Sequence, residues 1–556
     1  MTTSPTAACA ADRPTLRSST SPEPGCSAGP PPLRDASEPL RQIKQQNYAR
    51  YVLSLLELKP TARNMPLELD LEMANSCNLN CKFCMLHGKP DRAYGRSGLM
   101  PEPLLEKVVP FFAGAAFTCL HGHGEPFMNP ALVATATAAR AQGVFVEFFT
   151  NGRMLSEERA RQLIEAKVTR LFISISTADP RLYEHLYERG HFELLRKNLE
   201  RLQKEKQRLG TEWPRIHFNA IAFRSTLPGL VELVDFAGQH GVAGIDLKPM
   251  VVYPHLGEIQ HETITYDPEQ HEPLLQAAEA RARERGLELY LDSFRHGCPK
   301  VADDEFESER ATPEEEGIRL EKPCPLVYRT MYVTAAGDTK PCAFASKNPA
   351  FSLGNLHERT VEEIWNGPRY RELRQAHVEG RVHPICRRCL RLNLAPPRDA
   401  AGDWLRFNGY RVYEYERAVQ ALTRASSAVA AANEHVQAAI DRSRFGFAAM
   451  ILEAMELLVP SLSNLEAEAI EAEQLLPGLD AIRPHISTVS SLVRELRDVM
   501  TSRTEPPHED DIRETVRDVL IPALERWPAL ADAFVSTFYE AHERLAEGCT
   551  PLTQGE

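Results

Sequence analysis

Three cysteines within eight residues constrain this chain more than any other feature. Cys77, Cys81 and Cys84 form a C-x3-C-x2-C triplet. Three thiolates on one short loop can hold a cubane 4Fe-4S cluster by three irons, which leaves the fourth iron open. The triplet follows residues 67–73, where apolar and acidic residues alternate as in a half-buried strand. The loop is therefore expected at the C-terminal end of a strand, where parallel α/β folds bind their ligands.

Zinc is the competing interpretation of the triplet. Cys77, Cys81, Cys84 and His87 would form a closed site of three thiolates and one imidazole. Zinc usually takes four nitrogen or sulfur ligands in such sites. The triplet alone leaves both metals open, and the segments that follow it bear on the choice.

Predicted strands and helices alternate after the triplet. The strands are expected at 117–120, 144–149, 170–176, 216–223 and 244–250, and the helices at 101–112, 130–142, 156–166, 181–209 and 228–240. Gly190 is expected to divide the fourth helix in two. This alternation predicts an α/β fold with a parallel sheet and crossover helices.

Several of these strand ends resemble the radical S-adenosylmethionine (SAM) superfamily. The matching residues are Cys77, Cys81 and Cys84, the Gly-His-Gly-Glu-Pro run at 122–126, Thr150-Asn151-Gly152, and the strand end Ser174-Ile175-Ser176. This context favours an iron–sulfur cluster over zinc at the triplet. The resemblance implies an enzyme, and six βα units would form a partial (β/α)6 TIM-type barrel over residues 65–290, open on one side.

The resemblance also implies the chemistry. The amino and carboxylate groups of SAM would chelate the open iron, and an electron from the reduced cluster would cleave SAM to a 5′-deoxyadenosyl radical. That radical would abstract hydrogen from a substrate held nearby, while the protein positions the reactants and excludes water. An electron donor such as flavodoxin or ferredoxin would reduce the cluster.

Five residues take cofactor-binding roles from the resemblance. Phe83 would help to seat the adenine, with a core aromatic as the alternative. Gly124 and Glu125 lie in the run whose backbone carbonyls would accept hydrogen bonds from the methionine amino group, and glycine permits close approach there. Ser174 and Ser176 would touch the ribose or the methionine carboxylate, with serines bonded to loop backbone as the alternative.

Other polar residues near strand ends have no assigned role. His123 would either add a polar group near the substrate or be satisfied by loop backbone. Arg224 and Lys248 would bind a carboxylate or phosphate, or be solvated rim charges. Tyr253 is a further rim candidate, and no residue is assigned as general acid or base.

A second cysteine set follows the barrel: Cys324, Cys342, Cys386 and Cys389. A strand at 331–334, a Gly-Asp turn and a strand at 339–342 predict a hairpin. A helical stretch at 361–377 follows, which Gly367-Pro368 is expected to interrupt.

This block resembles the auxiliary-cluster extension called SPASM, or its shorter relative called twitch. The matching features are Cys324-x12-Gly337-x4-Cys342, Leu353-Gly354-Asn355-Leu356, Trp365 and Cys386-x2-Cys389. The resemblance implies a small α+β domain at 298–395 with one auxiliary 4Fe-4S cluster, because the full SPASM form uses more cysteines and none follows Cys389 until Cys549. A zinc ribbon is the alternative, and Cys298 is a spare thiol.

The two ends of the chain differ in composition. Residues 1–38 are rich in Ser, Pro, Thr and Ala and are expected to be a disordered leader. Residues 410–556 predict a C-terminal all-α helical domain. Breaks or kinks are expected at prolines that include Pro460, Pro522 and Pro528. This domain would cover the barrel mouth, form a dimer, or dock a carrier or peptide.

Charge and hydropathy exclude some classes. The net charge of −13 argues against non-specific nucleic-acid binding, which needs a basic face. No apolar stretch is long enough for a membrane span. Most of the twelve cysteines cluster with metal spacing, and oxygen-sensitive clusters fit a reducing cytoplasm.

Three functions stay open. The enzyme would oxidise or rearrange a small molecule such as a sugar or cyclitol in natural-product biosynthesis, or it would mature a ribosomally made peptide. A single auxiliary cluster as electron acceptor favours the small molecule, since it resembles small-molecule dehydrogenases more than two-cluster peptide enzymes. The third possibility is a non-catalytic zinc-binding scaffold.

Overall fold

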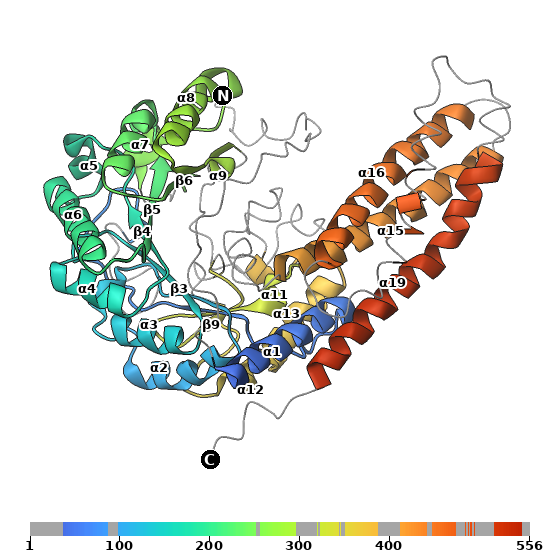
Figure 1. Ribbon diagram of the computed structural model, residues 1–556, viewed down its shortest axis with the longest axis horizontal. Helices are drawn as coiled ribbons and strands as arrows, with labels where there is room; N and C mark the ends of the chain where they lie inside the picture. The colour runs from blue at the N-terminus through green and yellow to red at the C-terminus, as the bar shows by residue number, and fades with distance from the viewer. Residues whose placement is uncertain are drawn as a thin grey trace.

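The computed structural model describes residues 37–86, 98–251, 256–295, 320, 323–343, 345, 351–386, 412–441, 447–473 and 516–547, with a few single residues between 484 and 494. The predictions for residues 1–36, His87, Tyr253, Cys298 and Cys389 lie outside these ranges. Figure 1 shows a curved α/β body from which long helices extend as an arm.

One nine-stranded sheet organises the body, in the order β7-β6-β5-β4-β3-β2-β1-β8-β9. All neighbouring pairs from β7 to β8 are parallel, and β8 pairs antiparallel with β9. The strands are β1 (Glu68–Leu71), β2 (Phe117–Cys119), β3 (Phe145–Thr150), β4 (Arg170–Ser174), β5 (Arg215–Ala222), β6 (Gly244–Pro249), β7 (Glu288–Tyr290), β8 (Thr330–Val333) and β9 (Thr339–Lys340). The predicted α/β fold with a partial barrel is confirmed. Strand β7 was not predicted, and β8, which was predicted as part of the hairpin, joins the same sheet.

Helices cover the outer side of this curved sheet (Figure 1). They are α2 (Glu102–Val108), α3 (Leu132–Ala141), α4 (Glu157–Glu165), α5 (Pro180–Leu186), α6 (Phe192–Arg208), α7 (Leu230–Gln239) and α8 (Pro268–Arg285). Side-chain caps start several of them: Ser156 accepts from the Arg159 N–H, and Asp179 accepts from the Leu182 N–H. The predicted division near Gly190 is confirmed, because α5 ends before it and α6 begins after it.

Strand β1 is buried on both faces, although its alternating sequence predicts a half-buried strand. Its acidic side chains find partners inside the barrel. Glu68 forms a buried ion pair with Arg329 (3.0 Å) and accepts from the Thr330 hydroxyl (2.6 Å). Asp70 accepts from the Cys119 N–H, and burial raises its pKa well above the usual range, with the Glu68 charge adding to this. The acidic residues therefore belong to the interior.

The segment after the barrel continues the same sheet. Strand β8 pairs with β1 from Glu68↔Thr330 to Leu71↔Val333. Around it lie α11 (Leu326–Arg329), α12 (Val361–Trp365) and α13 (Pro368–Val378). The predicted hairpin and the interruption at Gly367-Pro368 are confirmed. This segment is joined to the barrel by backbone hydrogen bonds across a shared sheet.

The arm consists of α15 (Val412–Asp441), α16 (Phe447–Glu473) and α19 (Ile521–Glu547), preceded by a π-helical turn at Val516–Leu520. The expected break at Pro460 is wrong, because α16 continues through it. Proline removes one backbone hydrogen bond, and the buried neighbours Leu458 and Leu462 hold the helix in place. Pro522 is the second residue of α19, directly after the π-helical turn, and α19 also continues through Pro528. No helix in the described part of the chain is long and apolar enough to cross a membrane.

Helix α1 (Glu38–Glu57), which the sequence did not predict, lies between the barrel and the arm (Figure 1). On the barrel side, the buried Lys44 Nζ donates to the backbone oxygens of Phe112 (2.9 Å) and Ala115. Asn47 Nδ2 donates to the Gly114 oxygen at 2.9 Å. These bonds satisfy carbonyls at the end of the helical segment before β2.

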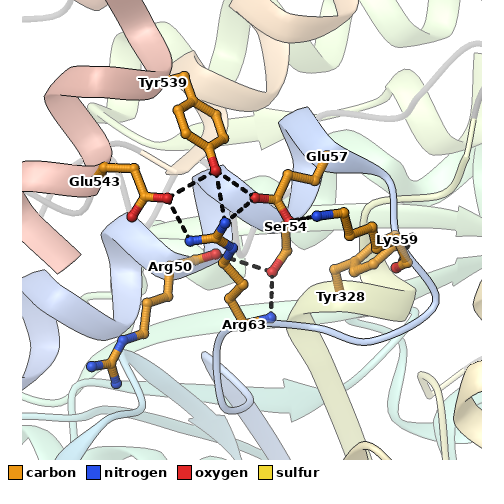
Figure 2. Close-up of polar contacts among 8 residues, drawn as sticks. All are labelled: Arg50, Ser54, Glu57, Lys59, Arg63, Tyr328, Tyr539 and Glu543. Carbon is orange, nitrogen blue, oxygen red and sulfur yellow. Dashed lines mark hydrogen bonds and ion pairs between the residues drawn. The ribbon is translucent and has the colours of Figure 1, made fainter. Parts of the chain in front are cut away.

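A polar cluster joins α1 to α19 on the other side. Figure 2 shows Arg63 between Glu57, Tyr539 and Glu543. Arg63 donates to the Tyr539 hydroxyl and to Glu543, both at 2.7 Å, and pairs with Glu57. The Tyr539 hydroxyl lies 2.8 Å from the carboxylates of Glu57 and Glu543. The arm is thus fastened to the barrel through α1.

The buried Lys44 predicts a pH dependence of stability. Burial lowers its pKa from 10.5 to about 7, and the Arg140 charge adds to this. Between these values folding releases a proton, so stability rises with pH. We expect the free energy of unfolding of wild type, relative to that of Lys44→Met, to rise from pH 7 to pH 10 by at most about 5 kcal/mol. Urea unfolding at both pH values measures this difference. Lys204→Met, at an exposed position on α6, is the control, and equal pH slopes in all three proteins would contradict the prediction.

Candidate functional site

The cysteine triplet directly follows β1, at the C-terminal end of the parallel strands. Its loop is fixed from the side of α5: the Asn80 N–H donates to the Glu188 oxygen and the Lys82 N–H to the Leu186 oxygen, both at 3.0 Å. Within the loop the Cys84 N–H donates to the Cys81 oxygen at 3.0 Å. These hydrogen bonds define the path of the loop.

The three thiols lie close enough to affect one another. Burial raises the pKa of Cys77 to about 11, and the charges of Glu125 and Cys84 add to this. Burial also raises the pKa of Cys81 well above its usual range, with Cys84 and Cys77 as further causes. Three partly buried thiols that oppose one another's ionisation need bound cations to become thiolates. This arrangement fits a three-thiolate ligand set for a cluster.

The Gly-His-Gly-Glu-Pro run lies alongside the residues that lead into the triplet. The Gly124 N–H donates to the Ala74 oxygen (3.0 Å), and the Glu125 N–H donates to the Ser76 oxygen (2.9 Å). A Cβ at Gly124 would lie 2.6 Å from the Ser76 nitrogen and 2.8 Å from the Ala74 oxygen. Glycine at position 124 is therefore required by the close approach of two backbones.

The Glu125 side chain has a structural role that the sequence did not indicate. Its carboxylate accepts from the Thr150 hydroxyl (2.7 Å), the Asn151 N–H (2.8 Å) and the Phe127 N–H (3.2 Å). Burial raises its pKa to about 6 against the effect of these bonds. Asn151 in turn donates to Asn78 Oδ1 at 2.7 Å and lies 3.8 Å from Cys77 Sγ. Glu125 and Asn151 thus connect the end of β3 to the cysteine loop.

The other predicted cofactor-binding residues also lie near this end of the sheet. Phe83 packs against Tyr187 and Phe223, with ring centroids 5.1 Å apart in both pairs. Ser176 Oγ accepts from the Ile221 N–H (3.0 Å) and lies 2.7 Å from the Tyr187 hydroxyl. Ser174 is the last residue of β4. The roles of Phe83, Ser174 and Ser176 toward SAM stay predictions.

Two residues from the predicted rim have different environments. Arg224 donates to the backbone oxygens of His261 (3.2 Å) and Thr263 (3.3 Å), which fastens a loop. Lys248 lies 3.0 Å from Asp246 and 5.4 Å above the centre of the Phe149 ring. The Lys248 ammonium is therefore on the inner side of the barrel.

His121 faces the same interior, and its sequence position predicted no role for it. Its ring centroid lies 5.8 Å from that of Phe149 and 5.7 Å from that of Tyr332. Burial, with the nearby Lys248 charge, lowers its pKa to about 4, so it is neutral at pH 7. The available signal was its position directly after β2 in a histidine- and glycine-rich run. The backbone N–H of His123 donates to Glu72 Oε1 at 3.1 Å.

Helix α13 supports the second cysteine set. Burial raises the pKa of Tyr370, and the nearby Cys342 thiol adds to this when it is charged. His377, two turns further along, contacts Cys324 and Cys386. Cys324, Cys342 and Cys386 are thus gathered along one helix face, and Cys389 lies outside the described residues. Among the residues that the structure describes, no three His, Cys, Asp or Glu side chains are arranged to hold a single metal ion.

A buried arginine fixes this helix. Arg374 is fully buried and donates to the backbone oxygens of Val327 and Trp365, both at 2.9 Å. Its guanidinium lies 4.4 Å from the Trp365 ring centre and 5.0 Å from that of Tyr370. Helices α11, α12 and α13 therefore meet at one side chain.

Comparison with known proteins covers both cysteine sets. The family model of the radical SAM superfamily matches residues 71–213, and the SPASM model, an iron–sulfur cluster-binding domain, matches residues 324–390. A cofactor-modifying protein for tungsten-containing aldehyde ferredoxin oxidoreductase, from Pyrococcus furiosus, is 23% identical over 58% of this chain and 86% of that protein. A PqqA peptide cyclase from Xanthomonas campestris is 23% identical over 54% of this chain and 73% of its own length.

For two further similar proteins, the match covers a smaller share of their own length. The subtilosin biosynthesis protein AlbA of Bacillus subtilis is 22% identical over 56% of this chain and 62% of its own length. Among solved structures, SuiB of Streptococcus suis bound to SAM has a TM-score of 0.42 at 17% identity, over 56% of this chain and 68% of SuiB.

The two family models cover the same segments as the cysteine motifs. With the parallel partial barrel, they establish an enzyme whose cofactors are SAM and 4Fe-4S clusters. The chain is a member of the radical SAM superfamily with a SPASM-type extension.

Proposed function

We propose that this enzyme oxidises or rearranges a small polar molecule, with one auxiliary 4Fe-4S cluster as the electron acceptor. The cysteine count of the extension carries the proposal. Cys324, Cys342, Cys386 and Cys389 supply four ligands, and no cysteine follows until Cys549. A cluster with all four irons ligated has no open iron for a substrate, so its role would be electron transfer.

The shared sheet supports this role. Strands β1 and β8 pair in continuous register, and a buried ion pair joins Glu68 of β1 to Arg329, the residue directly before β8. Strand β1 leads to the first cysteine set, and β8 belongs to the segment that carries the second. The separation of two clusters mounted on such a frame would be fixed, which suits repeated transfer of one electron.

The inner face of the barrel supports a small polar substrate. Asn219 lies between Ser174 and Asp246 in strand register. Its Oδ1 atom is buried and has no hydrogen-bond partner among the described residues. Lys248 and Asp246 place a charged donor and acceptor nearby, and Phe149 adds an aromatic face. Such a set would suit a molecule with hydroxyl or amino groups and apolar ring faces.

The division of labour would then be as follows. The reduced cluster with bound SAM would supply the radical that abstracts hydrogen. Glu125 and Asn151 would hold the cysteine loop against the end of β3, and the inner polar residues would orient the substrate. Because His121 is neutral at pH 7, it would not add a second positive charge beside Lys248.

Peptide maturation is the second candidate, and the names of the relatives favour it. One is a peptide cyclase acting on PqqA, and another serves biosynthesis of the bacteriocin subtilosin. The substrate therefore has to be tested directly.

The test compares two substrate panels. Reconstituted enzyme with SAM and dithionite would be offered aminocyclitols and amino sugars, or ribosomal peptides, and 5′-deoxyadenosine and substrate oxidation would be measured. We expect turnover with the small molecules. Lys248→Met is expected to lower kcat/KM about tenfold to a hundredfold, because it removes a charged hydrogen bond. The control Lys197→Met lies on the exposed face of α6. Turnover of peptides alone would favour the maturase, and no SAM cleavage with any substrate would favour the zinc scaffold.

A further inference from the structure

One imidazole contacts two cysteines of the second set. His377 on α13 is 1% exposed. Its Nδ1 atom accepts the backbone N–H of Cys324 at 3.2 Å, and its Nε2 atom lies 3.5 Å from Cys386 Sγ. These cysteines come from segments 53 and 9 residues away from His377. The ring therefore bridges the first and third cysteines of the set.

The contact with Cys324 determines the position of the ring proton. A nitrogen that accepts a hydrogen bond uses its lone pair and carries no hydrogen. Since Nδ1 accepts from the backbone, the single proton of the neutral ring is on Nε2. That N–H points at Cys386 Sγ, within the distance at which sulfur accepts a hydrogen bond.

The same argument excludes His377 as a cluster ligand in this arrangement. A protonated Nε2 has no lone pair for iron, and the four cysteines already match the four irons of one cluster. Hydrogen bonds to cluster sulfurs stabilise the reduced form, which carries one more negative charge. They therefore raise the reduction potential.

We infer that His377 is a positioning residue that raises the reduction potential of the auxiliary cluster by donating its Nε2–H to the Cys386 sulfur. The inference rests on the proposed auxiliary cluster at this site. A higher potential makes the cluster a better acceptor of the single electron that leaves the substrate radical.

The surroundings hold the imidazole in this orientation. Arg374, one turn earlier on α13, fixes the helix to the backbone of α11 and α12. The Cys324 N–H fixes the plane of the ring from the other side. The donor is thus held in place by the protein and needs no rearrangement when the cluster changes charge.

The test isolates the auxiliary cluster in the full chain. The parent protein carries Cys77→Ala, Cys81→Ala and Cys84→Ala, so that iron bound after anaerobic reconstitution belongs to the second site. Its reduction potential is measured by potentiometric titration with electron paramagnetic resonance.

Adding His377→Leu to this parent is expected to disfavour the reduced cluster about tenfold, which lowers the potential by about 59 mV for one electron. His377→Gln keeps an acceptor and a donor on one amide and should restore most of the potential. His240→Leu removes a buried histidine at the C-terminal cap of α7 and should leave the potential unchanged.

The outcomes separate the inference from the proposed function. A parent protein without iron overturns both. A parent with about four irons, whose potential does not change in His377→Leu, overturns the inference alone. If the Leu variant holds no iron, His377→Met replaces it, because methionine also lacks the donor and fills more of the volume. A Met variant that also holds no iron overturns the inference, since His377 would then be needed to hold the cluster.

Discussion

Replacing Cys77, Cys81 and Cys84 together with alanine is expected to lower the iron content from about eight to about four per chain. Cleavage of SAM to 5′-deoxyadenosine should disappear completely. The triplet supplies all three thiolates predicted for the SAM-binding cluster, so the triple variant keeps none of the protein ligands of that cluster. The measurement is iron, sulfide and zinc per chain after anaerobic purification, followed by the cleavage assay.

Cys119→Ala is the matched control for this experiment. Cys119 is a free, fully buried thiol in β2, and its backbone N–H, which donates to Asp70, is kept. Its loss should leave both iron content and SAM cleavage unchanged. Iron that falls from about four to none in the triple variant, with one zinc retained, would make the second site structural. Electron transfer through the extension, and with it the inference about His377, would then have to be abandoned.

The strand and helix pattern of the barrel was predictable because residues close together in the sequence determine each element. Most predicted barrel strands are short, mainly apolar runs followed by a polar residue, and each helix has its own period. The breaks at Gly190 and at Gly367-Pro368 follow from backbone preferences of single residues. The break expected at Pro460 was wrong because packing against neighbouring helices outweighs the loss of one hydrogen bond.

Long-range pairing was not predictable in the same way. Nothing within 330–333 indicates that this strand lies beside β1, about 260 residues earlier. Helix α1 was also missed, since its residues show little difference between an apolar and a polar face. The acidic residues of β1 suggested a solvated face, and only the structure shows that Arg329 neutralises Glu68 inside the barrel.

The candidate site also has some features that local sequence predicts and others that depend on long-range contacts. The cysteines and the glycine-rich run were found from spacing, which is a local signal. The side-chain roles of Glu125, Asn151, His121 and His377 depend on partners from other strands and helices. The sequence around a single histidine in a helix does not indicate what the histidine contacts, so only the structure reveals the contacts of His377.

Gly124→Ala is expected to lower SAM-dependent turnover at least about a hundredfold, the cost of misplacing reacting groups by about 1 Å. The backbone at Gly124 does not need a positive φ, so alanine is permitted by conformation. The added methyl group would nevertheless overlap Ser76 and the Ala74 oxygen, which are backbone atoms that cannot rotate away. The run would have to move off the segment that leads into Cys77, and its carbonyls would lose their proposed position at the methionine amino group.

Gly257→Ala is the matched control, because a Cβ there has no atom within 4 Å. Binding of SAM by equilibrium dialysis and its reductive cleavage would be measured in both variants, with iron content and circular dichroism as checks on the clusters and the fold. We expect both variants to keep their iron and only Gly124→Ala to lose SAM affinity. Full SAM binding in Gly124→Ala would show that the run can shift without affecting the cofactor, and the roles proposed for Gly124 and Glu125 would be wrong. Loss of iron together with SAM binding would instead show that the run supports the cysteine loop itself, as the bonds from Gly124 and Glu125 to Ala74 and Ser76 allow.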